Sequence, residues 1–230
     1  MLDSLREAVC QANRELVHCG LVTLTWGNTS AIDRDRGLVV IKPSGVAYDL
    51  LQPPDMSVVD LDGRVVEGKW RPSSDTPTHL LLYRSFPRVG GITHTHSRHA
   101  TMFAQARREI PCLGTTHADH FRGAVPVTRA LTEAEVTGDY ETNTGRVIVE
   151  QFATLDPVAM PAVLVAGHGP FTWGTDAGES VRNAVALEAV AEIALGTRLI
   201  DPAAPGLEPF VLDKHYQRKH GPAAYYGQKK

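Results

Sequence analysis

Apolar residues in the first twenty positions recur at intervals of three and four, which is the spacing of one helix face. Ser4 followed by Glu7 predicts a capping box at the start of this helix, and Gly20 predicts its end. The predicted apolar face consists of Leu2, Leu5, Val9, Ala12 and Leu16.

Short apolar runs bounded by turn residues predict β-strands through much of the remaining chain. Asp62-Gly63, between two of these runs, is the dipeptide typical of a two-residue hairpin. The strands are expected at residues 22–26, 38–41, 57–61, 64–67, 89–94, 145–150 and 162–165.

Helix signals alternate with these strands. Thr76 is expected to cap one helix with Pro77 at its first position, and Ser97 is expected to cap another. Helices alternating with hairpin-connected strands predict an α/β fold, a layered single domain with a central, largely antiparallel β-sheet flanked by helices. We expect this domain to span residues 1–230. The later helices are expected at 76–86, 97–106 and 179–195.

The composition narrows the class of protein. With 23 basic and 26 acidic residues, the formal charge of −3 lacks the basic excess of a nucleic-acid-binding protein. The apolar run at 160–167 is far shorter than the roughly 18 residues of a membrane-spanning helix, and the N-terminus lacks the pattern of a secretory signal. Three widely spaced cysteines without a CxxC predict neither disulfides nor a thiolate zinc site. We therefore expect a soluble cytoplasmic protein that binds neither nucleic acid nor membrane.

Histidines are placed where they suit a metal site. His94 and His96 lie two apart at the end of the strand expected at 89–94, so their side chains point to one face and could share a metal ion. Two polar residues at a solvated strand end are the alternative interpretation. His168 favours the metal, because glycines flank it directly after the strand expected at 162–165. A glycine-flanked histidine can also be a simple turn residue.

Three neutral imidazoles form a good Zn²⁺ site with a fourth position open for substrate or a carboxylate. Asp75, directly after Ser73 and Ser74, is the candidate carboxylate ligand. Asp75 is equally placed to cap the helix that follows it, so both interpretations stay open.

Three short polar turns offer hydroxyl, amide and backbone N–H donors, and one adds the ammonium of Lys42. Phosphate needs several donors and a positive charge, so the turns together predict an anion site, although each alone is an ordinary turn. None matches a Walker or dinucleotide fingerprint, so a nucleotide is not implied. The turns are Trp26-Gly-Asn-Thr-Ser30, Lys42-Pro-Ser-Gly45 and Ser73-Ser74.

Two later segments carry further polar groups. Asp119, in TTHADH, is a candidate proton-transfer residue, though an aspartate in a loop is more often a turn or solvated residue. The tail from Asp201 is aromatic and basic without apolar periodicity. Because it holds three tyrosines, we expect it to dock on its own body or on a neighbouring subunit.

Together these motifs resemble the L-ribulose-5-phosphate 4-epimerases of the class II aldolase/epimerase family, over nearly the whole chain. The paired histidines alone indicate the wider family, whereas Asp75 and the TTHAD and AYYGQ segments indicate the epimerases. The resemblance is weakest at 147–159 and 195–209, and His120 stands where relatives often have tyrosine. The motifs are TWGNTS, IKPSGV, PSSDTPTH, GGITHTHSRHAT, TTHADHF, GHGPF and DKHYQRKHG…AYYGQ.

The resemblance implies a role for each matching residue. It implies a homotetramer with active sites at subunit interfaces, where Tyr226 reaches in from an adjacent subunit and His215 lies near the site. It also implies Zn²⁺ as cofactor, with other divalent ions such as Mn²⁺ substituting. The implied metal ligands are Asp75, His94, His96 and His168. The implied phosphate and substrate contacts are Gly27, Asn28, Lys42, Ser44, Gly45, Ser73 and Ser74. The implied catalytic residues are Asp119, Tyr226 and His215.

The implied reaction interconverts L-ribulose 5-phosphate and D-xylulose 5-phosphate. The hydrogen on carbon 4 is not adjacent to the carbonyl at carbon 2, so its direct removal would give no stabilised carbanion. Retro-aldol cleavage between carbons 3 and 4, followed by re-addition to the other face of the aldehyde, avoids this difficulty. One acid/base group is then needed on each face, which suits Asp119 and Tyr226.

Two other functions fit parts of the pattern. A class II sugar-phosphate aldolase releases the aldehyde and typically has glutamate where this chain has Asp75. A noncatalytic scaffold, such as the adducin head, shares the fold but has no need of His94, His96 and His168 together. Arabinose and ascorbate catabolism both use such an epimerase, and the sequence does not indicate which one this chain serves.

Overall fold

A seven-stranded sheet forms the centre of this computed structural model, which describes residues 2–226. The strand order is β4-β3-β2-β1-β5-β7-β6, and every neighbouring pair is antiparallel. The layered α/β fold with a largely antiparallel sheet is therefore confirmed. The strands are β1 (Asn28–Asp33), β2 (Leu38–Ile41), β3 (Ser57–Asp60), β4 (Val65–Glu67), β5 (Gly91–His94), β6 (Ala162–Leu164) and β7 (Pro170–Gly174).

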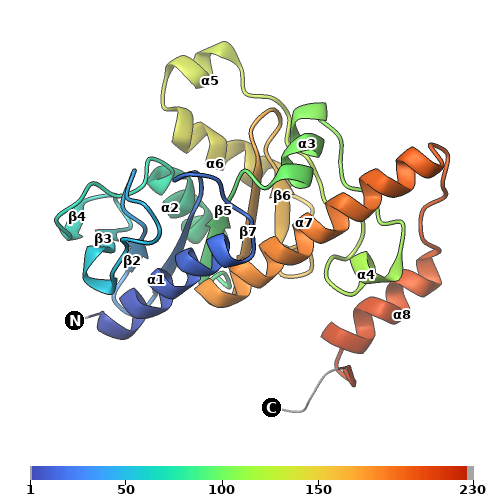
Figure 1. Cartoon of the computed structure of the whole chain (residues 1–230), viewed down its shortest axis with the longest axis horizontal. Helices are drawn as coiled ribbons and strands as arrows, with labels where there is room; N and C mark the ends of the chain where they lie inside the picture. Colours follow the sequence, from blue (N-terminus) through green and yellow to red (C-terminus); the bar gives the residue numbers. More distant parts are fainter. Residues whose placement is uncertain (1, 227–230) are drawn as a thin grey trace.

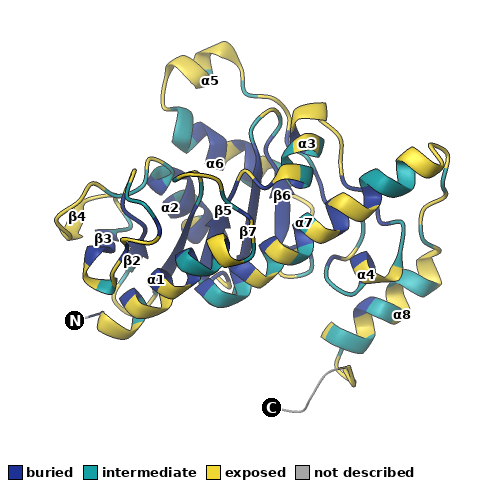
Figure 2. Cartoon of the chain, in the orientation of Figure 1, coloured by how far each residue is buried: buried dark blue, intermediate teal, exposed yellow. Residues whose placement is uncertain are grey.

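Helices cover both faces of this sheet, with α1 and α7 in front and α2 and α6 behind in Figure 1. Alternate strand residues enter the two cores: Val40 packs with the α1 residues, whereas Val39 packs with the α2 and α6 residues. Figure 2 shows the central strands buried between these helices. The helices are α1 (Asp3–His18), η1 (Pro53–Asp55), α2 (Thr76–Ser85), α3 (Arg98–Ala106), α4 (Thr115–Ala118), α5 (Glu133–Thr137), α6 (Tyr140–Gln151), α7 (Ala177–Ile200) and α8 (Pro209–His220).

The structure confirms the glycine turns that the sequence predicts at Gly20 and Gly63, but not the helix caps predicted at Ser4 and Ser97. Gly20, at φ +69°, follows the end of α1, and Gly63, at φ +86°, turns the β3–β4 hairpin. The predicted Ser4 capping box is wrong, because α1 begins at Asp3 with Leu2 as its N-cap. Ser97 does precede α3, but its side chain caps nothing.

The strand predicted at 22–26 is wrong, since these residues form an irregular turn and the first strand begins only at Asn28. Leu24 has a left-handed φ of +52°, and its side chain is 75% exposed. The alternation of apolar and polar residues is real here, but only Val22 packs against the core, whereas Leu24 and Trp26 are exposed. This turn leads directly into the first residue of the central strand β1.

The strand predicted at 145–150 is also wrong, because these residues belong to α6. A short apolar run such as Val147-Ile-Val fits a buried helix as well as a buried strand. The helix begins earlier, where the Asp139 side chain accepts a hydrogen bond from the backbone N–H of Thr142. A β-carbon at Gly145 would lie 2.9 Å from Leu81 of α2, so the glycine allows α6 to pack closely on α2.

The remaining differences concern short or late elements. Strands β1 and β7 and helices η1, α4, α5 and α8 were not expected from the sequence, and Asn28 to Ser30, expected in a polar turn, begin β1. The tail is ordered as α8, which packs against α4, while Gly227 and Gln228 of the AYYGQ segment lie outside the described residues. The three cysteines are free, and no described helix is long and apolar enough to cross a membrane.

Candidate metal centre and substrate cavity

His94 ends strand β5 at the middle of the sheet, where it pairs with Asn28 of β1 and Phe171 of β7. Its ring stacks on Phe171, with 4.2 Å between ring centroids. Its Nδ1 lies 2.9 Å from the carbonyl oxygen of Pro170, which can only accept, so Nδ1 carries the proton. The unprotonated Nε2 of His94 is therefore free to bind a metal, and it lies 3.1 Å from Nε2 of His96.

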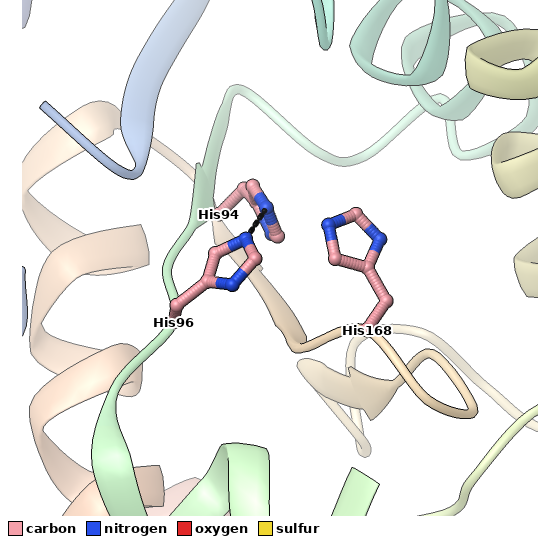
Figure 3. A group of neighbouring side chains, drawn as sticks. All are labelled: His94, His96 and His168. Carbon is pink, nitrogen blue, oxygen red and sulfur yellow. Dashed lines mark hydrogen bonds between the residues drawn. The ribbon is translucent and has the colours of Figure 1, made fainter. Parts of the chain in front are cut away.

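His168 approaches these two rings from the loop between β6 and β7, and Figure 3 shows the three imidazoles facing one another. Gly167 has a left-handed φ of +75°, and a β-carbon at Gly169 would lie 2.7 Å from the Thr95 carbonyl oxygen. The two flanking glycines thus let this loop turn and approach β5 closely. The three histidines each offer a nitrogen, all within 4.8 Å of one another.

The donor set fits a divalent cation. Burial and the neighbouring imidazoles lower the pKa of His96 to about 4 and that of His168 to about 3, so both rings keep a lone pair at neutral pH. Two imidazole nitrogens on a tetrahedral Zn²⁺ would be about 3.3–3.4 Å apart. The 3.1 Å between Nε2 of His94 and Nε2 of His96 is close to that separation.

Asp75 lies beside the histidines without joining their cluster. It occupies the N-cap position of α2, as the capping interpretation expects, but its side chain makes no cap hydrogen bond. Its Oδ2 instead accepts from Nδ2 of Asn28 at 2.6 Å. Burial raises the pKa of Asp75, but the nearby histidines and Asn28 outweigh this and lower it overall. The carboxylate is therefore ionised at neutral pH, and it lines the same cavity as the metal-binding rings.

A cavity of about 520 Å³ opens over the histidines, and every metal ligand and phosphate contact inferred from the sequence lines it. The distant turns meet because Pro43 bridges Pro72, and the N–H of Ser73 donates to the carbonyl of Lys42. A β-carbon at Gly27 would lie 2.8 Å from the carbonyl oxygen of His94, so only glycine allows this turn to approach β5. The expected lining residues are Gly27, Asn28, Lys42, Ser44, Gly45, Ser73, Ser74, Asp75, His94, His96 and His168.

In the described part of the chain, two polar atoms of this cavity lack the partner that a buried group usually has: the Lys42 ammonium has no carboxylate, and Oδ1 of Asn28 has no hydrogen-bond donor. Lys42 is almost completely buried, and within residues 2–226 its Nζ contacts the Pro43 carbonyl at 3.3 Å and the Tyr48 ring but forms no ion pair with a carboxylate. Burial lowers its pKa to about 8. Oδ1 of Asn28 is buried with no hydrogen-bond partner among the described residues. An anion bearing hydroxyl groups would satisfy both residues.

The three catalytic candidates lie elsewhere, in one cluster formed by Asp119 at the end of α4, His215 of α8 and Tyr226, which follows α8. Arg218 donates two hydrogen bonds to the Asp119 carboxylate, at 2.9 and 2.6 Å, and His215 Nδ1 lies 3.1 Å from the same group. The guanidinium carbon of Arg218 lies 4.6 Å from the centre of the Tyr226 ring. Burial raises the pKa of Asp119, but Arg218 and His215 lower it overall. None of Asp119, His215 and Tyr226 lines the histidine cavity of its own chain.

Two wall residues of the cavity, Tyr140 and Glu141, belong to none of the motifs that the sequence shows. Both lie in the first turn of α6, and the mistaken strand at 145–150 left them in an expected loop. Asp139 followed by Thr142 is the cap signal that would have revealed the helix start. Arg218 was missed because its partner Asp119 is 99 residues away in the chain.

Comparison with known proteins agrees with this geometry. Residues 7–195 match the family described as Class II Aldolase and Adducin N-terminal domain. The L-ribulose-5-phosphate 4-epimerase UlaF of Salmonella paratyphi B is 57% identical over 228 residues, covering 99% of this chain and 100% of the relative. A solved L-fuculose 1-phosphate aldolase is 25% identical with a TM-score of 0.80, covering 94% of this chain and 95% of that one. The L-fuculose-1-phosphate aldolase of Thermus thermophilus is 27% identical with a TM-score of 0.67, covering 88% and 98%. This chain belongs to the class II aldolase and adducin N-terminal domain family.

Proposed function

We propose that the protein is a metal-dependent L-ribulose-5-phosphate 4-epimerase, an isomerase that interconverts L-ribulose 5-phosphate and D-xylulose 5-phosphate by retro-aldol cleavage and re-addition. The observation that carries this proposal is the cavity of about 520 Å³ that joins three converging histidines to the buried Lys42, which forms no ion pair with a carboxylate of residues 2–226. The 57% identity to a protein named as this epimerase supports the choice of reaction.

His94, His96 and His168 would hold Zn²⁺ through their ring nitrogens, with Mn²⁺ as an alternative ion and Asp75 as a fourth ligand beside them. When bound, such an ion acts as a Lewis acid on the carbonyl and hydroxyl oxygens of the substrate. The Pro170 carbonyl keeps His94 in the tautomer that exposes Nε2, so this ligand is oriented before the metal arrives.

The substrate phosphate would lie at the polar turns. The Lys42 ammonium supplies the charge, and Ser44, Gly45, Ser73 and Ser74 supply hydroxyl and N–H donors from the turns around it. Oδ1 of Asn28, which has no hydrogen-bond partner in the described part of the chain, would accept from a sugar hydroxyl, while its Nδ2 stays on Asp75. These contacts fix the phosphate end, so that the carbon–carbon bond to be broken lies near the histidines.

Asp119 and Tyr226 would serve as the acid/base pair, assisted by His215. Because both lie outside the cavity of their own chain and both contact Arg218, we propose that a neighbouring subunit supplies this cluster to the cavity. The protein would then be a homotetramer with composite active sites, built from one domain per chain whose C-terminal tail completes a neighbour's site. We also propose that it acts in the cytoplasm, in arabinose or ascorbate catabolism.

Purified protein incubated with L-ribulose 5-phosphate should form D-xylulose 5-phosphate, and a chelator should stop the conversion until Zn²⁺ is added back. A class II aldolase would instead release free dihydroxyacetone and glycolaldehyde phosphate from the same substrate. Accumulation of these two fragments without the epimer would contradict the proposed function, as would undiminished conversion by protein stripped of metal.

A further inference from the structure

Tyr140 is held in the cavity wall by the packing of α6 on α2. Besides the close contact of Gly145 with Leu81, the Thr78 hydroxyl of α2 donates to the Glu141 carbonyl at 2.6 Å. These contacts fix the first turn of α6 next to the first turn of α2, where Asp75 lies. The Tyr140 side chain is half-buried and lines the same cavity as the three histidines.

The hydroxyl oxygen of Tyr140 lies 3.4 Å from Nδ1 of His168. In Figure 3 the His168 nitrogen next to the ring carbon that carries the side chain, Nδ1, turns away from His94, and Nε2 faces the cluster. Nδ1 is also the nitrogen that lies beside Tyr140. A metal bound at Nε2 requires a lone pair there, so the proton of the neutral ring must sit on Nδ1. His168 therefore donates to Tyr140, and the phenol oxygen is the acceptor.

This direction of donation decides where the phenol proton points. A hydroxyl that accepts from Nδ1–H cannot also donate to that nitrogen, so its own proton is turned away from His168. The phenol keeps this proton at neutral pH, because a tyrosine hydroxyl ordinarily titrates near pH 10. Two directions remain for it: toward Thr144, which hydrogen-bonds the Tyr140 side chain, and into the cavity in which the substrate would lie.

We propose that Tyr140 is a positioning and substrate-binding residue of this site: its oxygen accepts from Nδ1–H of His168, and its O–H donates to an oxygen of a hydroxylated, phosphorylated ketose in the cavity. The identity of the substrate in this inference rests on the proposed function, but the predicted effect of Tyr140 on metal binding does not rest on it. Tyr140 belongs to the chain that supplies the histidines, unlike the Asp119–Tyr226 cluster that a neighbour would contribute.

The test is Tyr140→Phe, which keeps the ring and removes only the hydroxyl, compared with Thr142→Val, which removes a hydroxyl from the same helix outside the cavity. Zn²⁺ affinity is measured without substrate by competition with a chelating dye. We expect Tyr140→Phe to bind Zn²⁺ about tenfold more weakly, as is usual for the loss of a partner behind a metal ligand, and Thr142→Val to bind as the wild type does. The visible spectrum of the Co²⁺-loaded protein should change only in Tyr140→Phe.

Repeating the substitution in a His168→Asn variant distinguishes two explanations of a loss of Zn²⁺ affinity: a lost hydrogen bond to His168, or a general distortion of α6. Because the proposed effect passes through His168, adding Tyr140→Phe to His168→Asn should leave Zn²⁺ affinity unchanged within about twofold. A further tenfold loss in this background, or no loss from Tyr140→Phe in the wild-type background, would overturn the positioning role.

Kinetics test the donation to substrate. We expect kcat/KM for L-ribulose 5-phosphate to fall about 100-fold in Tyr140→Phe when Zn²⁺ is saturating, since a lost donor in a closed site costs this much. An unchanged kcat/KM at saturating Zn²⁺ would refute the donation. If the wild type itself does not convert this substrate, the proposed function fails, while the Zn²⁺ measurements still decide whether Tyr140 positions His168.

Discussion

At the scale of single residues, His96 is the proposed metal ligand whose side chain is held in place by fewer contacts than that of His94. His94 is held by strand pairing, by stacking on Phe171 and by the Pro170 carbonyl, whereas His96 lies beyond the end of β5 and contacts His94 at 3.1 Å. His96→Asn removes one of the three ligand nitrogens, so the variant should lose most of the bound metal and all activity. Metal content by atomic spectroscopy checks this, with the exposed His18→Asn as control. Full occupancy in His96→Asn would reject the assignment.

Lys42 should make phosphate binding depend on pH. Burial lowers the pKa of its ammonium to about 8 in the free protein, so the positive charge is present below that pH and is lost as the pH rises through it. We expect KM for the sugar phosphate to rise from about pH 8 upward, approaching tenfold per pH unit. Steady-state kinetics from about pH 6.5 to about pH 9.5 measure this rise.

Lys42→Met provides the comparison for that pH series. It should raise KM strongly even at neutral pH, leave metal content unchanged, and show no further rise of KM at alkaline pH. Turnover of non-phosphorylated ribulose should not be affected by the substitution. Equal use of ribulose and its phosphate ester by the wild type would show that Lys42 does not bind phosphate.

At the scale of elements, the close packing of α6 on α2 determines where one wall of the cavity lies. A β-carbon at Gly145 would lie 2.9 and 3.2 Å from two Leu81 carbons, so Gly145→Val must push the two helices apart. We expect it to lower the free energy of unfolding by about 1–3 kcal/mol, the usual cost of overpacking. Zn²⁺ affinity should fall as well, because Tyr140 and His168 separate.

Gly196→Val is the matched control for Gly145→Val. Gly196 lies within α7, and a β-carbon there meets no atom within 4 Å. The same substitution should therefore be neutral or slightly stabilising, since valine is a better helix residue than glycine. Urea unfolding and Zn²⁺ titration of both variants measure the difference. Equal destabilisation at the two positions would mean that helix packing is not the cause.

The elements also show where sequence patterns suffice. Segments with a strong local signal were predicted well: the stripe of α1, the Asp62-Gly63 hairpin, and the Ala-rich α7. Segments 22–26 and 145–150 were not, because burial by distant chain decides whether an apolar run becomes a strand, a helix or an exposed turn. Leu24 faces solvent, while Val147 is buried against other helices.

In the candidate site, too, features with a local sequence signal could be predicted, whereas those that depend on distant parts of the chain could not. His94 and His96 could be predicted from their spacing, and His168 from its glycines, because each signal is local. That Asn28 lies beside His94 follows from the pairing of β1 with β5, a register that no local pattern specifies. The partnership of Asp119 with Arg218 likewise depends on α8 packing against α4.

At the scale of the whole molecule, the separation of Tyr226 from the cavity of its own chain leads to a test of the assembly. Helix α8 packs against α4, and in the Asp119–Arg218–Tyr226 cluster the Tyr226 ring is exposed while Asp119 and Arg218 are mostly covered. If a neighbour supplies this cluster, Tyr226→Phe should lose epimerisation while metal content and oligomeric state stay intact. Cleavage of the substrate should be less affected, because Asp119 serves the other face of the aldehyde.

Mixing two inactive variants then distinguishes the source of Tyr226. Tyr226→Phe keeps a sound metal site, and His96→Asn keeps a sound tyrosine, so a mixed oligomer contains some cavities in which both are sound. After subunit exchange, verified by mass spectrometry, part of the wild-type activity should return, in proportion to the fraction of correctly paired interfaces. The separate variants, treated identically, should stay inactive. Verified exchange without recovery would show that Tyr226 acts within its own chain or outside catalysis. In the first case every site in the mixed oligomer would still carry the defect of its own chain, so mixing could not restore activity.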